Sequence, residues 1–220
     1  MRKLLRLFPL MIIAAGTTAC LQKDTHHTLY LSSDGAVAWT AMENDVTSDE
    51  TDPASRATEE RDFLAAAGNG EHAVALGLYA LGALDVRTRI LRAERPYIVM
   101  TDARFDRIDT LANAVLKELC VPGVASLARS GDRLTLSVHL AIPEEEEEMS
   151  GQSAVTALME DLDRYRIVLT NGSFTAADGF ALQSNGSVAV GIPRDDEEIR
   201  AHGGTLDLSL TWSAQAGSTR

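Results

Sequence analysis

Thiol and imidazole side chains are the groups in this chain best suited to nucleophilic or metal chemistry. The chain has two cysteines, Cys20 and Cys120, and five histidines: His26, His27, His72, His139 and His202. A zinc site needs three or four such ligands at workable spacing, and neither a His-Glu-x-x-His nor a Cys-x-x-Cys pattern occurs. Cys120 follows the apolar end of a helical stripe, which predicts a buried and inert thiol. We therefore expect no metal centre and no cofactor.

Carboxylates form four clusters, at 49–52, 59–60, 144–148 and 195–198. None matches the twelve-residue calcium loop, which needs alternating oxygen ligands around a central glycine. The run Glu144 to Glu148 is interpreted as a solvated connection, because five successive side chains cannot all face one ion. No nucleophile elbow, phosphate loop or dinucleotide fingerprint is present. A carboxylate pair that meets only in three dimensions leaves no local pattern, so a cell-envelope hydrolase remains the alternative function.

Composition excludes several classes of protein. The 220 residues are 45% apolar and 24% charged, with a formal net charge of −12. This balance indicates a globular chain with a real core and gives no basic patch for nucleic acid. With so few cysteines, a disulfide framework is excluded.

The first twenty residues carry the clearest signal in the sequence. Arg2, Lys3 and Arg6 precede an apolar segment at 7–15, four small residues follow at 16–19, and then comes Cys20. This order predicts a signal peptide over 1–19, with an apolar run too short for a permanent membrane helix. A plain secretory signal with a chance cysteine is the other interpretation.

The small residues followed by Cys20 resemble the lipobox of bacterial lipoproteins, although Thr17 stands where that family usually has Leu. The resemblance implies cleavage before Cys20 and acylation of its sulfur and nitrogen, palmitate included. Two or more acyl chains anchor a protein stably in a membrane. In the family's sorting rule an Asp after the cysteine retains the protein at the inner membrane. Leu21 therefore implies the outer membrane, with the protein facing the periplasm.

Periodicity predicts a polar tether over 20–27, a single α+β domain over 28–213 and a polar tail over 214–220. The domain opens with a hairpin at 28–42 around Ser33-Asp34-Gly35, followed by a loop at 43–55. Helices are expected at 54–67, 71–84, 108–119 and 153–165, the second of them apolar on nearly every face. Strands are expected at 86–94, 97–105, 124–129, 133–142, 166–170, from 174 onward, 187–192 and 205–212, with hairpin turns at Asn171-Gly172 and Asn185-Gly186 and one helical turn within 195–202. These elements indicate a mainly antiparallel, twisted sheet built from hairpins, with three to four helices packed on it.

The helix at 108–119 has the most regular apolar stripe. Its inward residues are Ile108, Leu111, Ala112, Val115, Leu116 and Leu119. Lys117 lies on the opposite, solvated side.

The order of anchor, strand-Asp-Gly-strand, helices, hairpin and late strands resembles the LppM-like domain of some bacterial lipoproteins. The best local overlap is Tyr97 to Leu116, followed by the Ser130-Gly131-Asp132 turn. The resemblance implies a membrane-tethered antiparallel sheet and brings no catalytic residues. The expected function is a non-catalytic binding or structural role in the cell envelope. The expected partners are the membrane, through Cys20, and an envelope protein or lipid.

Overall fold

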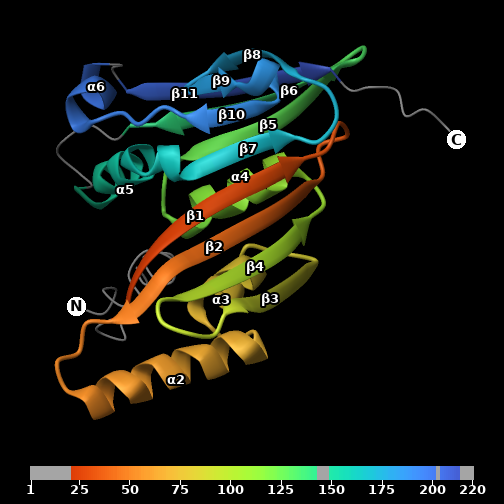
Figure 1. Ribbon diagram of the computed structural model, residues 1–220. Coiled ribbons are helices and arrows are strands. Elements are labelled where there is room, and N and C mark those ends of the chain that lie inside the picture. Colours follow the sequence, from red (N-terminus) through yellow and green to blue (C-terminus); the bar gives the residue numbers. More distant parts are fainter. Residues whose placement is uncertain (1–20, 143–148, 202–203, 214–220) are drawn as a thin grey trace, which may run out of the picture. The chain divides into compact units, whose positions relative to one another are not determined.

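The computed structural model describes residues 21–142, 149–201 and 204–213 (Figure 1). In chain order the elements are β1 (Leu21–Leu31), β2 (Val37–Ser48), α2 (Pro53–Asn69), α3 (Ala73–Ala80), β3 (Asp85–Arg92), β4 (Tyr97–Phe105), α4 (Ile108–Glu118), β5 (Gly123–Ser130), β6 (Arg133–Ala141), α5 (Met149–Glu160), the 3-10 turn η1 (Leu162–Arg164), β7 (Tyr165–Leu169), β8 (Phe174–Asp178), β9 (Phe180–Gln183), the 3-10 turn η2 (Ser184–Gly186), β10 (Val188–Gly191), α6 (Asp196–Ala201) and β11 (Thr205–Ser213). The predicted α+β class with mainly antiparallel strands is confirmed.

The described residues form two compact units. Unit 1 comprises 21–27 and 39–104, and unit 2 comprises 28–38 and 105–213 with the gaps given above. In unit 1 the strands follow the order β3-β4-β2-β1, and α2 and α3 pack against β3. The first hairpin contributes to both units: its turn and the adjoining ends of β1 and β2, residues 28–38, belong to unit 2, and the rest of the two strands belongs to unit 1.

The first hairpin turns where the sequence predicted, but both of its strands are longer than expected. The segment 21–27, predicted to be a polar tether, is the first part of β1, where Thr25 and His27 are buried. The predicted loop at 43–55 is likewise wrong at its start, since β2 continues to Ser48 with Glu43 buried. Both errors have one cause: polar residues at alternate positions can face the interior of a sheet when they find polar partners there.

Helix α2 is close to the predicted range 54–67, and it begins and ends on local signals. Asp52 accepts a hydrogen bond from the Ser55 N–H at 2.8 Å, and Gly70 ends the helix at φ 71°. Helix α3 is shorter than predicted and is buried on one face only, because Leu76 and Tyr79 are exposed. Within the described residues, no helix has both the length and the apolar character that crossing a membrane requires.

Unit 2 contains two sets of strands. One follows the order β5-β6-β11-β8, and the other follows β1-β7-β10-β9. Asn185 (φ 57°) and Gly186 (φ 82°) lie at the turn between the antiparallel strands β9 and β10, which confirms the second predicted hairpin. The hairpin predicted at Asn171-Gly172 is wrong, because β7 and β8 belong to different sets. Only Gly172 has a positive φ there, whereas a type I′ turn needs two such residues.

The predicted stripe of α4 is confirmed. Ile108, Leu111 and Leu116 are buried, and Lys117 is exposed. Leu116 belongs to an apolar cluster of unit 2 whose other buried members are Val121, Leu140, Ile142, Val155, Met159, Leu162, Ile199, Leu206 and Leu208. Helix α4 is also fixed to β5 by Asn113, whose amide donates to the Ala125 carbonyl and accepts from the Ala125 N–H.

Leu116→Ala should lower the free energy of unfolding by about 2–5 kcal/mol, the usual cost of emptying a leucine site in a core. Lys117→Ala, one residue along on the exposed side, should cost less than about 0.5 kcal/mol. Urea unfolding of both variants measures the difference. Equal losses would mean that the stripe does not define the buried face.

Candidate functional site

Of the residues singled out in the sequence, those that the structure describes do not meet in one site. Cys20, His202 and the run Glu144 to Glu148 lie outside the described residues. The prediction of a buried Cys120 is wrong, because this cysteine is exposed. It follows the last turn of α4 in a left-handed conformation (φ 55°), and the next residue, Val121, returns to the apolar cluster that contains Leu116.

His27, His72 and His139 each have a side-chain partner from another part of the chain. His27 Nδ1 accepts from the Trp39 indole N–H at 3.1 Å, and the two rings meet edge to face. His139 lies on the solvated side of β6, 2.7 Å from Asp207. Among the described residues no three His, Cys, Asp or Glu side chains come together as metal ligands.

The most deeply buried polar contact of unit 1 is centred on Glu43. Its side chain is only 1% exposed, and its Oε1 accepts from Lys23 Nζ at 2.5 Å. Its Oε2 lies 3.1 Å from His72 Nε2, at ion-pair distance but outside hydrogen-bond geometry. Burial alone would raise the pKa of Glu43, but His72 and Lys23 together hold it below its ordinary value. Glu43 is therefore a carboxylate held in its charged form by neighbours from β1 and from the start of α3.

A line of polar contacts leads from this carboxylate toward β3. His72 Nε2 lies 3.2 Å from Thr101 Oγ1, and Thr101 Oγ1 lies 3.3 Å from Thr88 Oγ1. In a catalytic triad the nucleophile and the carboxylate use different ring nitrogens. In unit 1 the Thr101 hydroxyl and Glu43 share Nε2, while Nδ1 is buried without a partner. The arrangement thus lacks the geometry that activates a hydroxyl nucleophile.

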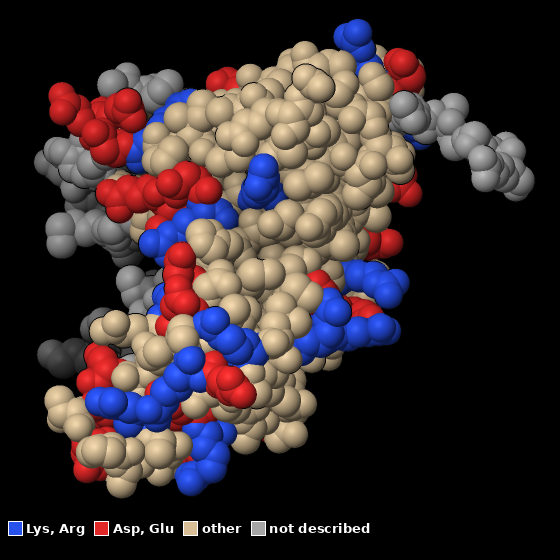
Figure 2. Space-filling model, viewed as in Figure 1, with Lys and Arg blue, Asp and Glu red and all other residues tan. Residues whose placement is uncertain are grey.

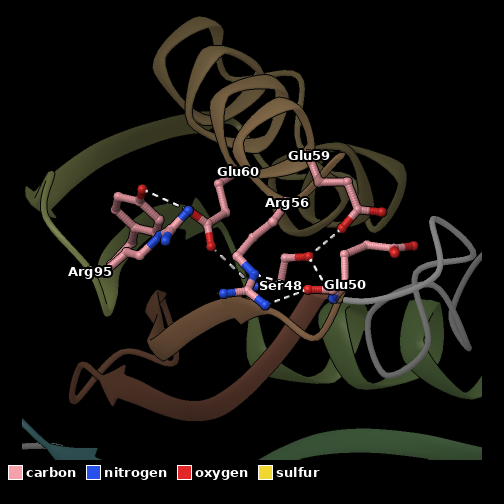
Figure 3. Close-up of polar contacts among 7 residues, drawn as sticks. Ser48, Glu50, Arg56, Glu59, Glu60 and Arg95 are labelled. Atoms are coloured by element: carbon pink, nitrogen blue, oxygen red, sulfur yellow. Dashed lines mark hydrogen bonds and ion pairs between the residues drawn. The ribbon is translucent and has the colours of Figure 1, made fainter. Parts of the chain in front are cut away.

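A second buried carboxylate, Glu60 of α2, joins the helix to the β3–β4 hairpin (Figure 3). It accepts from Arg95 Nε at 2.5 Å, from the Tyr97 hydroxyl at 2.9 Å and from the Ser48 N–H at 3.3 Å. Burial raises the pKa of Tyr97, and the adjacent Glu60 carboxylate raises it further. The phenol therefore stays protonated and donates a hydrogen bond. The three hydrogen bonds that Glu60 accepts hold α2 to the end of β2 and to the β3–β4 hairpin.

Neighbouring polar groups extend this contact along α2, as Figure 3 shows. Ser48 Oγ donates to Glu59 at 2.6 Å and accepts from the Glu50 N–H at 3.1 Å. The Arg56 guanidinium donates to the Glu50 carbonyl through both Nε and Nη2. Three carboxylates of the clusters at 49–52 and 59–60 thus have structural contacts: Asp52 caps α2, and Glu59 and Glu60 accept hydrogen bonds from Ser48. Glu50 takes part through its backbone.

Unit 1 also contains an open groove of about 760 Å³. It is lined by the end of α2 at 68–70, by Tyr79 of α3, by 86–89 of β3 and by Asp102 of β4. Neither Glu43 nor Glu60 lines it, and the two carboxylates share no hydrogen-bond partner. A glycosidase-type site needs two carboxylates facing one cleft. Among the described residues that line the groove, Asp102 is the one carboxylate, so no such pair faces it.

Sequence reasoning missed the residues that matter most in unit 1: Glu43, His72, Glu60 and Arg95. For Glu43 a signal was available, since Trp39, Ala41 and Glu43 alternate on one face of β2. For His72 and Glu60 the sequence carried no local signal, because their partners are up to 37 residues away in the chain.

Comparison with known proteins assigns no function to this chain. No family model matches the chain, and no curated protein matches it. Among solved structures, the folded domain of the Mycobacterium tuberculosis LppM protein, determined by NMR, is similar with a TM-score of 0.39 and 11% identity, covering 89% of this chain and 91% of that chain. This is a domain of the type that the element order resembles. At this distance the likeness transfers no function, so what the protein does has to be argued from its own residues.

Glu60→Gln should lower the free energy of unfolding at pH 7 by about 1–3 kcal/mol, the scale of hydrogen bonds to a charged group. The half-exposed Arg95 contributes little of this loss. Burial opposes ionisation of Glu60, yet the hydrogen bonds from Arg95, Tyr97 and the Ser48 N–H keep its pKa below the ordinary value of 4.5.

A lowered pKa stabilises the fold above pH 4.5, and this contribution disappears as the pH falls through the folded-state value. The difference between native protein and Glu60→Gln should therefore shrink on acidification, in urea unfolding measured from about pH 7 to about pH 3. Glu94→Gln, at an exposed position of the same hairpin, is the matched control and should change little. A pH-independent difference would contradict the assigned role of Glu60.

Proposed function

We propose that the protein is a lipoprotein of the bacterial cell envelope, anchored by acyl chains on Cys20, with a non-catalytic binding or structural role. The observation that carries the proposal is the order of a basic segment, an apolar segment, small residues and Cys20 at the start of the chain. Leu21 after the cysteine favours the outer membrane and an orientation toward the periplasm.

The start of β1 at Leu21 has a geometric consequence for such an anchor. A strand advances about 3.3 Å per residue, so the first residues of unit 1 would lie within a few ångströms of the acylated cysteine. Unit 1 would then be held at the membrane surface with no intervening linker.

The binding role is supported by the groove of unit 1 and by the use of both buried carboxylates in structural contacts. The volume of the groove lies in the range usual for ligand clefts, about 300–1,000 Å³. The arrangement of hydroxyl, imidazole and carboxylate at Thr101, His72 and Glu43 lacks catalytic geometry. A binding protein is therefore favoured over a hydrolase.

Cys20→Ser should abolish incorporation of radiolabelled palmitate in cells and release the protein from membranes into the soluble envelope fraction, because acylation needs the thiol. Cys120→Ser is the matched control, since it removes the other cysteine, which is exposed. It should leave labelling and membrane association unchanged. Palmitate labelling that survives Cys20→Ser would refute the proposed anchor.

A further inference from the structure

Strand β3 has a free edge that opens into the groove. In unit 1 it is the terminal strand of the order β3-β4-β2-β1, and its described pairing is with β4. Four consecutive residues of β3, 86–89, line the groove, and the end of α2 and Tyr79 form its other side. A groove between a strand edge and helical residues is the setting in which an extended peptide adds to a sheet.

The backbone groups of β3 have the direction that such addition needs. The Tyr79 hydroxyl donates to the Val86 carbonyl at 3.5 Å, so this carbonyl points away from β4. In an antiparallel ladder the direction alternates along the strand, and the register with β4 is regular from Asp85 to Ile90. The N–H and carbonyl of Thr88 therefore also point to the free edge. Thr88 is the residue to which an added strand would form its main-chain hydrogen bonds.

Two exposed arginine side chains lie beside this edge. Arg87 and Arg89 flank Thr88 and lie on the other face of the sheet, where their side chains are 71% and 59% exposed. The segment 85–104 contains five arginines and three acidic residues, a net charge of +2 in a chain whose net charge is −12. Figure 2 shows Lys and Arg side chains gathered, among Asp and Glu, over β3 and β4. The ion pairs of Arg87 with Asp85 and of Arg89 with Asp102 are exposed and therefore weak.

This charge pattern disfavours a second copy of the chain as the occupant. In an antiparallel pair of two β3 strands centred on Thr88, Arg87 would lie opposite Arg89 of the other copy. Like charges in directly opposed positions destabilise a strand pair, whereas opposite charges stabilise it. An extended segment with acidic residues at alternate positions would face both arginines. The residue between them would point to the other face, toward the groove beside the half-exposed Tyr79.

We infer that the free edge of β3 is a docking site for an extended segment of a partner protein with the pattern acidic–apolar–acidic. The segment adds to unit 1 as a further strand, with main-chain hydrogen bonds to Thr88 and with its acidic side chains beside Arg87 and Arg89. This site specifies the partner of the proposed binding role, but it does not depend on acylation of Cys20.

Fluorescence anisotropy with the full chain in detergent tests the site, with a fluorescein-labelled peptide Ser-Thr-Glu-Val-Glu-Thr-Ser as the probe. The same peptide with Lys in place of both Glu is the charge control. The acidic peptide should bind with a Kd at least about tenfold lower than the lysine peptide, because two cross-strand charge pairs change sign. Combining Arg87→Glu with Arg89→Glu should reverse this preference.

Two further variants separate the strand edge from charge alone. Thr88→Pro removes the N–H at the free edge and should weaken binding of the acidic peptide at least about tenfold, while Thr88→Val keeps the N–H and should bind as the native chain does. Combining Arg129→Glu with Arg133→Glu reverses two exposed strand arginines of unit 2 and should leave binding unchanged. Circular dichroism establishes that each variant is folded. If Thr88→Pro does not fold, the charge reversal still decides the question.

The proposal is overturned if the two peptides bind equally, if neither binds, or if the reversal at 129 and 133 has the same effect as the reversal at 87 and 89. If the native chain does not bind the acidic peptide but is labelled with palmitate, this docking site is refuted and the proposed acyl anchor at Cys20 still stands. If the native chain binds the acidic peptide but is not labelled with palmitate, only the proposed acyl anchor is refuted.

Discussion

The burial of Glu43 is the constraint on which the rest of unit 1 depends. A carboxylate that is 1% exposed is tolerated only when it is paired, because an unpaired buried charge costs several kcal/mol. Lys23 and His72 provide the pairing, one from the first residues of β1 and one from the start of α3. The segment after Cys20 must therefore be part of the sheet, and α3 must begin where the imidazole reaches the carboxylate.

Glu60 imposes the same kind of requirement at the other helix. Its three donors come from the end of β2 and from the β3–β4 hairpin, so α2 is held against both. With the two carboxylates used in this way, α2 and α3 are held beside β3, and residues 86–89 of that strand line the groove. The two buried carboxylates thus hold α2 and α3 in place, and neither of them lines the groove.

A free strand edge is a liability for a protein, since any extended chain can pair with it. Arginines at 87 and 89 reduce pairing between copies of this chain, because the copies would oppose like charges. The same charges select a partner of opposite sign. One pattern in β3 can therefore limit self-association and define specificity, which suits a protein proposed to be concentrated at a membrane surface.

The sequence by itself determined the elements whose signals are local. The Ser33-Asp34-Gly35 turn, the presence of helix α2 and the stripe of α4 follow from φ preferences, helix propensity and 3.6-residue periodicity, all readable within a few residues. Tertiary structure alone decided that Glu43 faces inward, that Cys120 faces solvent and that the strands on either side of Asn171-Gly172 do not pair. Each of these depends on partners distant in the chain, because the environment of a polar group or a strand is set by what packs against it, and local sequence does not encode that.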